Sequence, residues 1–310
     1  MLSLPRLRIL SELSNRGTIA ATARALSYTP SAVSQQLTLL EREAGVPLLE
    51  RVGRGVRLTG AAALLVDHAN AVMARLDLAE AELAATQHEL HGRMRVASFQ
   101  SVVLSLVPGA LDRMVIEHPH LRIDIVQREH GQAYEGLLSY EFDLILGEEY
   151  PGNPDRVRDE VDRFDLLTDP LRLALPAEGP LSERPRSLAD LAGAPWVLDP
   201  EDTPTGRWGR EVCRQAGFEP ITSFESPDLL LQAELVRTGH AVAFLPELLP
   251  STYLQGITFV SLPGDPHRVL YTASRAGRAG HPAVQAFREA LAEALEARRP
   301  ADPAWGVRVS

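Results

Sequence analysis

One apolar stripe constrains the fold of this chain more than any other feature of its sequence. Its members recur at strictly alternating spacings of four and three residues: Leu58, Ala62, Leu65, Ala69, Val72, Leu76, Ala79, Leu83, Thr86 and Leu90. The spacing predicts one helix of about 32 residues, roughly 48 Å long, with a coiled-coil seam along one side. A helix this long rarely stands alone. The narrow stripe favours a partner helix from a second copy, and packing against its own chain is the alternative.

The charge of the chain is divided unevenly along its length. Residues 1–60 contain eight arginines and four carboxylates, a net charge of +4, whereas the whole chain carries −10. The remaining 250 residues therefore carry −14, and a total of 310 residues favours two or more domains. A small basic head on a large acidic body indicates a nucleic-acid module joined to another function.

The sequence gives no sign of a membrane span or a disulfide framework. No stretch approaches 18 uninterrupted apolar residues, and Arg6 and Arg8 interrupt the apolar start of the chain, which is not typical of a signal peptide. We therefore expect a cytoplasmic protein without membrane contact. Cys213 is the only cysteine and is expected to be a small buried residue; Arg210 and Arg214, if close in space, would lower its pKa and favour a redox role.

Within the basic head, capping signals predict short helices. Thr18 caps an Ala-rich helix, and Thr29 caps a helix that begins at Pro30 and ends at Gly45. The face of this last helix opposite its apolar residues is uncharged and carries Ser31, Ser34, Gln35 and Thr38. Short hydroxyl and amide side chains can hydrogen-bond to base edges in the major groove. The pattern predicts a helix-turn-helix, with an ordinary polar surface as the alternative.

A short hairpin is expected directly after this helix. Two strands near 48–51 and 56–59 flank a Gly-Arg-Gly turn centred on Arg54. Arg54 at the tip can enter a narrow minor groove, and Arg51 can neutralise a phosphate. The hairpin is thus interpreted as a wing, with a solvated hairpin as the alternative.

The order of these segments resembles the LysR-type transcriptional regulators over residues 2–70. The resemblance rests on an Ala-rich helix, TPSAVSQQLTLLE, a glycine, PLLERVGRGVRLT and a long following helix. It implies a cytoplasmic regulator with an N-terminal winged helix-turn-helix, a dimerising linker helix and a C-terminal effector domain of the periplasmic-binding-protein type. It also implies DNA contacts at Pro30, Ser31, Ser34, Gln35, Arg51 and Arg54. Thr29 and Thr38, from the helix pattern, complete the predicted DNA-binding set. The sequence departs from the family at Leu49, where phenylalanine is common.

From residue 93 onwards, short apolar strands alternate with helices, which predicts an α/β body with a parallel sheet. The first helix of this body is expected from about 101 to 117. Two lobes joined by crossovers near 165 and 265 are inferred mainly from the resemblance. The expected units are a winged helix-turn-helix at 1–59, a linker and hinge at 60–92, an effector domain at 93–300 (lobe I at 93–165 and 266–300, lobe II at 166–265) and a tail at 301–310.

Strand ends at the junction of two such lobes are the expected place for a small ligand. The candidates are Ser98, Gln100, Ser101, Gly147, Glu148, Asp199, Thr203, Thr205 and Phe244. Glu148 and Asp199 would favour an amine, and the backbone N–H groups near Ser101 would favour a carboxylate, so an amino-acid-like effector fits both. Each polar candidate could instead be a helix cap or part of the solvated surface, and Phe244 could instead pack in the core.

These features predict a sequence-specific regulator of transcription whose partners are double-stranded DNA and a small-molecule effector. We expect it to form a homodimer or a homotetramer. We expect no cofactor, no metal site and no catalytic residue, because the chain has no Gly-rich phosphate loop, GxSxG or HExxH motif. The alternative is a two-lobed solute-binding protein or enzyme whose N-terminal head serves assembly.

Overall fold

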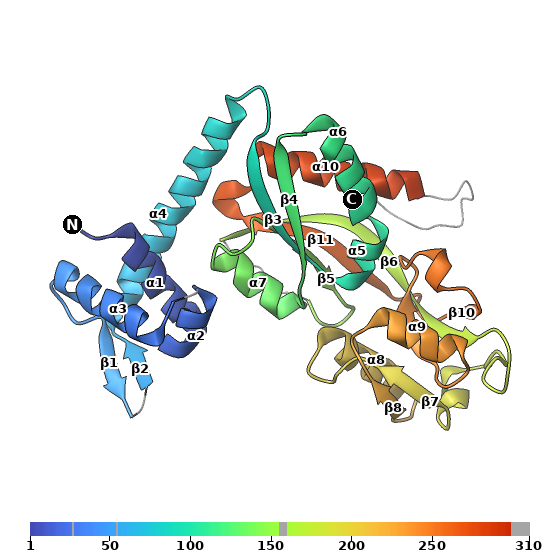
Figure 1. The fold of residues 1–310 in the computed structure, drawn as a ribbon. Helices are drawn as coiled ribbons and strands as arrows, with labels where there is room; N and C mark the ends of the chain where they lie inside the picture. Colours follow the sequence, from blue (N-terminus) through green and yellow to red (C-terminus); the bar gives the residue numbers. More distant parts are fainter. Residues whose placement is uncertain (27, 54, 155–159, 299–310) are drawn as a thin grey trace.

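The computed structural model describes residues 1–26, 28–53, 55–154 and 160–298 as a helical head, a long linker helix and a larger α/β body (Figure 1). Arg54, predicted to form the tip of the wing, and the expected tail at 301–310 lie outside the described residues. The head and linker comprise α1 (Leu4–Arg16), α2 (Ile19–Ala25), α3 (Pro30–Ala44), β1 (Leu49–Val52), β2 (Gly55–Leu58) and α4 (Gly60–Ala85). The predicted winged helix-turn-helix and long helix are confirmed.

Capping residues fix where the helices of the head begin and end. Thr18, Thr29 and Thr59 each accept a hydrogen bond at 3.1 to 3.2 Å from the backbone N–H three residues later. Gly45 ends α3 with a φ of 72°, a left-handed conformation that favours glycine. The predicted bounds of α3 are therefore confirmed, and the reason is local.

The linker helix α4 is shorter than predicted. It contains 26 residues and ends at Ala85, whereas the stripe predicted a helix continuing towards Leu90. The Thr86 hydroxyl donates to the carbonyl oxygen of Leu83 at 2.7 Å, so the residue that interrupts the apolar stripe also ends the helix.

The face of α4 that packs against its own chain differs from the predicted seam. The buried residues of α4 are Ala62, Val66, Ala69, Met73, Asp77 and Ala81. Of the larger seam residues, Leu58 and Leu65 pack against the core of the head, whereas Val72, Leu76 and Leu83 are exposed by 47%, 44% and 67%. At about 100° per residue, these three residues and the buried set lie on neighbouring faces roughly 100° apart. The chain alone therefore leaves the larger seam residues from Val72 to Leu83 uncovered.

Lobe I is a sheet with helices on both faces. Its elements are β3 (Gly92–Ser98), α5 (Gln100–Ser105), α6 (Val107–Glu117), β4 (Leu121–Gln127), α7 (His130–Leu138), β5 (Leu144–Glu149), β11 (His267–Arg275), η3 (Ala276–Arg278) and α10 (Pro282–Arg298). The predicted helix over 101–117 is in fact two helices, because α6 begins afresh at Val107 with Pro108, which has no N–H to donate, in its first turn. Alternate strand residues such as Val96 and Ala97 enter separate cores on the two faces.

The expectation of a parallel sheet is only partly correct. Strands β4, β3 and β5 are parallel, but β11 is antiparallel to β5 and to β6 (Val161–Pro176). Strand β6 is continuous through the expected crossover at 165. It pairs with β11 as far as Pro170 and then with lobe II strands from Leu171 onwards.

Lobe II surrounds the second half of β6. Its other elements are η1 (Leu188–Leu191), β7 (Pro195–Leu198), α8 (Pro204–Gln215), β8 (Ile221–Glu225), α9 (Leu229–Arg237), β9 (Ala243–Pro246), η2 (Ser251–Tyr253) and β10 (Ile257–Ser261). Trp196, Trp208 and Phe244 form the aromatic centre of its core, with Phe244 ring centroids 4.9 and 5.2 Å from those of the two tryptophans. The two lobes meet where β5, β6 and β11 approach α8 and α9 (Figure 1).

Candidate nucleic-acid interface and ligand site

The outer face of α3 is exposed and carries no charge from Ser31 to Thr38, while Arg42 is exposed in its last turn. Val33, Leu37 and Leu40 are buried in the head, so α3 turns Ser31, Ser34, Gln35 and Thr38 to the outside. The Thr38 hydroxyl donates to the carbonyl oxygen of Ser34 at 3.0 Å, while no described hydrogen bond occupies the amide of Gln35. Thr29 and Pro30 are exposed at the start of the same helix. This face can offer donors and acceptors to base edges.

A carboxylate that was not predicted as a site residue holds the wing against α3. Glu41 Oε1 accepts hydrogen bonds from the backbone N–H groups of Leu48 and Leu49 at 2.9 and 3.0 Å. This charge-assisted pair fixes the beginning of β1 relative to the helix. The only local signal was weak, a glutamate eight residues before the start of β1.

The arginines of the wing differ in their environments. Arg51 is exposed and has no carboxylate partner in the described residues, whereas Arg57 pairs with Glu50 across the hairpin at 2.8 Å. Arg51 therefore has a guanidinium available for a phosphate. The expected role of Arg54 falls on a residue outside the described ranges.

The junction of the two lobes is organised by Arg268, which was not among the predicted residues. Its side chain is 1% exposed and donates to Asp169 at 2.6 Å, Glu148 at 2.6 Å and Ser101 at 2.9 Å. Asp169 also accepts from the backbone N–H of Leu248 at 2.9 Å. Two predicted residues, Ser101 and Glu148, are thus brought together by an arginine that lies 167 and 120 residues after them in the chain.

A second group of polar residues converges on Tyr150, which was also missed. Its hydroxyl lies 3.2 Å from Glu148 Oε2, hydrogen-bonds to Thr205 and is close to the charge of Asp199. Burial raises the pKa of the Asp199 carboxyl to about 7; a hydrogen bond from Gln232 opposes this shift and the charge of Glu148 adds to it. Predicted residues from both lobes therefore meet here, and Asp199 can hold a proton near neutral pH.

Gln100 links the lobes directly. Its Nε2 donates to Asp228 Oδ1 and its Oε1 accepts from the backbone N–H of Leu229, both at 2.8 Å. Gln100 belongs to α5 of lobe I, and Asp228 and Leu229 form the start of α9 in lobe II. This amide is therefore engaged between the lobes in the state described.

The remaining predicted ligand residues have structural roles. Ser98 is fully buried; Thr203 caps α8 by accepting from Gly206 N–H at 3.0 Å; and Phe244 packs in the core of lobe II. A Cβ at Gly147 would lie 2.3 Å from the ring of Tyr271, so this glycine makes room for an aromatic side chain. The core and cap alternatives describe these positions better than ligand contact does.

Cys213 is the small buried residue that was expected, and the condition for a redox role, a pKa lowered by nearby arginines, is not met. Cys213 is fully buried, and burial together with the charge of Glu219 raises the pKa of its thiol to about 12, although Arg210 opposes the shift. A buried thiol with a raised pKa is unreactive. Within the described residues, no group of three His, Cys, Asp or Glu side chains is placed to hold a metal ion.

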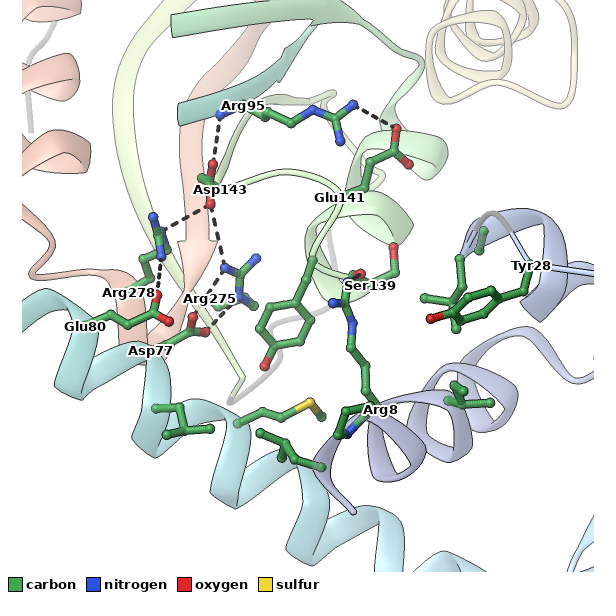
Figure 2. A pocket seen from close by; sticks show the side chains of 18 of the residues that line it. Arg8, Tyr28, Asp77, Glu80, Arg95, Ser139, Glu141, Asp143, Arg275 and Arg278 are labelled. Atoms are coloured by element: carbon green, nitrogen blue, oxygen red, sulfur yellow. Dashed lines mark hydrogen bonds and ion pairs between the residues drawn. The ribbon is translucent and has the colours of Figure 1, made fainter. Parts of the chain in front are cut away.

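A third polar cluster, also unpredicted, joins the linker helix to lobe I (Figure 2). Asp77 of α4 pairs with Arg275 of β11 at 2.8 Å, with both side chains buried. Arg275 also donates to the carbonyl oxygens of Leu137 and Phe142, and its guanidinium lies 4.0 Å from the ring centroid of Tyr140. The linker is thus attached to the loop between α7 and β5.

With this geometry established, comparison with known families decides the identity. Residues 4–63 match the bacterial regulatory helix-turn-helix family of LysR type, and residues 87–296 match the LysR substrate binding domain. The chain belongs to the LysR family of transcriptional regulators. It is a DNA-binding regulator with a C-terminal effector-binding domain and not an enzyme. This excludes the alternative of a solute-binding protein or enzyme whose N-terminal head serves assembly. No helix in the described parts of this LysR-type regulator is long and apolar enough to cross a membrane.

Similar proteins cover most of this regulator. The transcriptional dual regulator GltC of Bacillus subtilis is 28% identical over 247 residues, covering 79% of this chain and 81% of GltC. ClcR of Pseudomonas putida is 29% identical and covers 84% of this chain and 87% of its own. Among solved structures, a full-length OxyR variant from Pseudomonas aeruginosa has a TM-score of 0.66 at 19% identity, covering 94% and 95% of the two chains. CbnR in complex with its target DNA has a TM-score of 0.51 at 20% identity and covers 94% of this chain and 100% of CbnR.

Proposed function

We propose that this LysR-type regulator reads DNA in the major groove with the exposed face of α3. The observation that carries the proposal is the uncharged set Ser31, Ser34, Gln35 and Thr38 on a helix whose other face is buried. Thr29 and Pro30 lie at the end of α3 that would enter the groove first. Arg51 contacts a phosphate, and Arg54 reaches the adjacent minor groove. The regulator acts in the cytoplasm, where bacterial DNA is found.

The exposed seam on α4 supports a homodimer, or a tetramer built from dimers. Val72, Leu76 and Leu83 form an apolar row that the chain itself does not cover. A second α4 packed on this row would bury it as a coiled coil does. Two heads on one dimer would then contact two half-sites on double-stranded DNA.

A small molecule bound between the lobes is the proposed input signal. Glu148, paired with Arg268, and Asp199 offer carboxyl oxygens to an amine, and an ammonium group bound there would favour the ionised form of Asp199. The hydroxyl and backbone N–H groups at the starts of α5 and α8 suit a carboxylate, which supports an amino-acid-like effector. The effector would favour one arrangement of the lobes, for example by replacing the link from Gln100 to α9. The linked movement of α4 would change the spacing of the heads on DNA.

Binding of the full-length protein to the DNA flanking its own gene tests the first proposal. We expect tight binding that weakens steeply as salt rises, with a large preference over a scrambled duplex. The double variant Gln35→Ala with Arg51→Gln should lose that preference. Equal, weak binding of both duplexes by wild type and variant would refute the assigned DNA face.

Thermal unfolding in the presence of each common amino acid tests the effector class. A ligand at one hundred times its dissociation constant stabilises the native state by about 2.7 kcal/mol. We expect one amino acid to raise the melting temperature of wild type and of the exposed control Asp202→Asn, but not of Asp199→Asn. Absence of any shift across the set would exclude an amino-acid effector.

A further inference from the structure

A large cavity lies where the DNA-binding head meets lobe I, separate from the lobe junction (Figure 2). Its volume is about 800 Å³, and its walls come from α1, α2 and α4 on one side and from β3, β11 and residues 139–143 on the other. Cavities of roughly 300–1,000 Å³ accommodate small organic ligands. The position matters because one occupant would contact head, linker and effector domain together.

The carboxylates that line this cavity are already neutralised. Each has a guanidinium partner: Asp77 with Arg275 at 2.8 Å, Glu80 with Arg278 at 3.2 Å, Asp143 with Arg278 at 3.3 Å and Glu141 with Arg95 at 3.6 Å. A cationic ligand would therefore have to compete with an arginine for every acidic group of the wall.

The head side of the cavity has cationic groups that lack an acidic partner. Arg8 of α1 donates through Nη2 to the carbonyl oxygen of Ser139 at 2.7 Å, but its Nε is buried with no hydrogen-bond partner. Arg24 of α2 lines the same cavity, and no carboxylate in the described parts of the chain pairs with either arginine. A buried donor without a partner is unfavourable, and an anion at this position would satisfy Arg8 Nε, with the exposed Arg24 supplying a second positive charge.

Apolar side chains complete the wall. Ile9 and Leu26 of the head, Met73 and Leu76 of α4, and Tyr28 line the cavity beside the two arginines. Leu76 also belongs to the exposed seam of α4. The combination of uncompensated cations and apolar surface fits a molecule with an anionic end and an apolar body.

We propose that this head–effector cavity binds an organic carboxylate with an apolar body, such as a medium-chain fatty acid, with its carboxylate on Arg8 and Arg24. The site goes beyond the effector site proposed between the lobes and does not share residues with it. Since its walls belong to the head and to lobe I, the ligand binds only while the two are docked and therefore favours that arrangement. It would act as a second input to DNA binding.

Calorimetric titration of the full-length protein with octanoate tests the proposal. We expect saturable binding that weakens about tenfold or more in Arg24→Gln and in Arg8→Gln, because each variant loses one charge-assisted hydrogen bond to the carboxylate. The control Arg184→Gln removes an exposed arginine of lobe II and should bind as wild type does. Octanol, which has the same chain without the charge, should bind at least tenfold more weakly than octanoate.

Three results would overturn the proposal. They are absence of saturable octanoate binding, equal affinity in wild type and both cavity variants, and loss of binding in Asp199→Asn with retention in Arg24→Gln. The last result would place octanoate at the lobe junction and leave the proposed effector site standing. Conversely, failure of the amino-acid screen would not alter octanoate binding, so the two proposals fail separately.

Discussion

The backbone of Gly277 lies so close to α4 that a Cβ built on it would stand 2.2 Å from the carbonyl oxygen of Ala74. Gly277 is part of η3, directly after β11. One turn further along α4, Asp77 accepts from Arg275, the last residue of β11. A backbone contact and a buried ion pair therefore hold the linker helix against the effector domain. We expect α4 to move together with lobe I for this reason.

Replacement of Gly277 by alanine should disturb this contact. The added methyl group cannot fit against backbone, so α4 and η3 must separate, and we expect a loss of about 1–3 kcal/mol in the free energy of unfolding. Hydrogen exchange of α4 amides should rise in parallel. Gly280→Ala is the matched control, because a Cβ there meets nothing within 4 Å. Equal stability of the two variants would show that the approach is not tight.

The Asp77→Asn variant should be strongly destabilised. Removal of Asp77 leaves the buried Arg275 cation with only the more distant carboxylate of Asp143, at 4.0 Å, among its described partners. Loss of one partner from a buried ion pair typically costs about 3–5 kcal/mol, and we expect a value towards the lower end. Glu80→Gln, one turn away, removes an exposed partner of Arg278 and should cost well under about 1 kcal/mol. Urea unfolding of both variants measures the difference. If Asp77→Asn were no less stable than Glu80→Gln, the pair would contribute nothing to linker attachment.

The elements of the head were predictable because their signals are local. A Thr-Pro start and a Gly end, 16 residues apart, determine α3 from residues within a few positions of each terminus. The same holds for the apolar strand segments of the body. The antiparallel pairing of β6 with β11 was harder to predict, because these two strands pass between the lobes. The order of strands and helices along the chain does not reveal that pairing.

The candidate sites were predictable only in part. Ser101 and Glu148 follow strands and were found for that reason, but Arg268 and Asp169, which determine their environment, lie 99 residues apart and give no local pattern. The heptad stripe also could not distinguish the face of α4 that packs on its own chain from the face left open. That distinction depends on where lobe I and α1 meet the helix.

Gln35 and Gln36 are adjacent glutamines with different expected roles. Gln35 is exposed on the proposed reading face of α3, whereas the Gln36 side-chain oxygen accepts from Arg6 of α1 at 3.0 Å. Gln35→Ala should reduce the preference for the specific duplex by about 1–3 kcal/mol, the value of a bidentate base contact. Gln36→Ala should affect stability more than preference. Competition binding against a scrambled duplex checks both, and a larger loss of preference in Gln36→Ala would contradict the assigned orientation.

Asp199 should make the stability of the protein depend on pH between about 4 and 7. Its pKa is raised from 3.8 to about 7 by burial, so in this range the native state holds a proton that the unfolded chain releases. The free energy of unfolding therefore falls as pH rises, by up to about 1.4 kcal/mol per pH unit from this group. Urea unfolding at pH 5 and pH 8 should show a smaller decrease in Asp199→Asn than in wild type, with Asp202→Asn behaving as wild type. An unchanged decrease in Asp199→Asn would mean that the Asp199 carboxylate is solvated in the folded protein. Asp199, the proposed partner of a ligand amine, would then be negatively charged at both pH values.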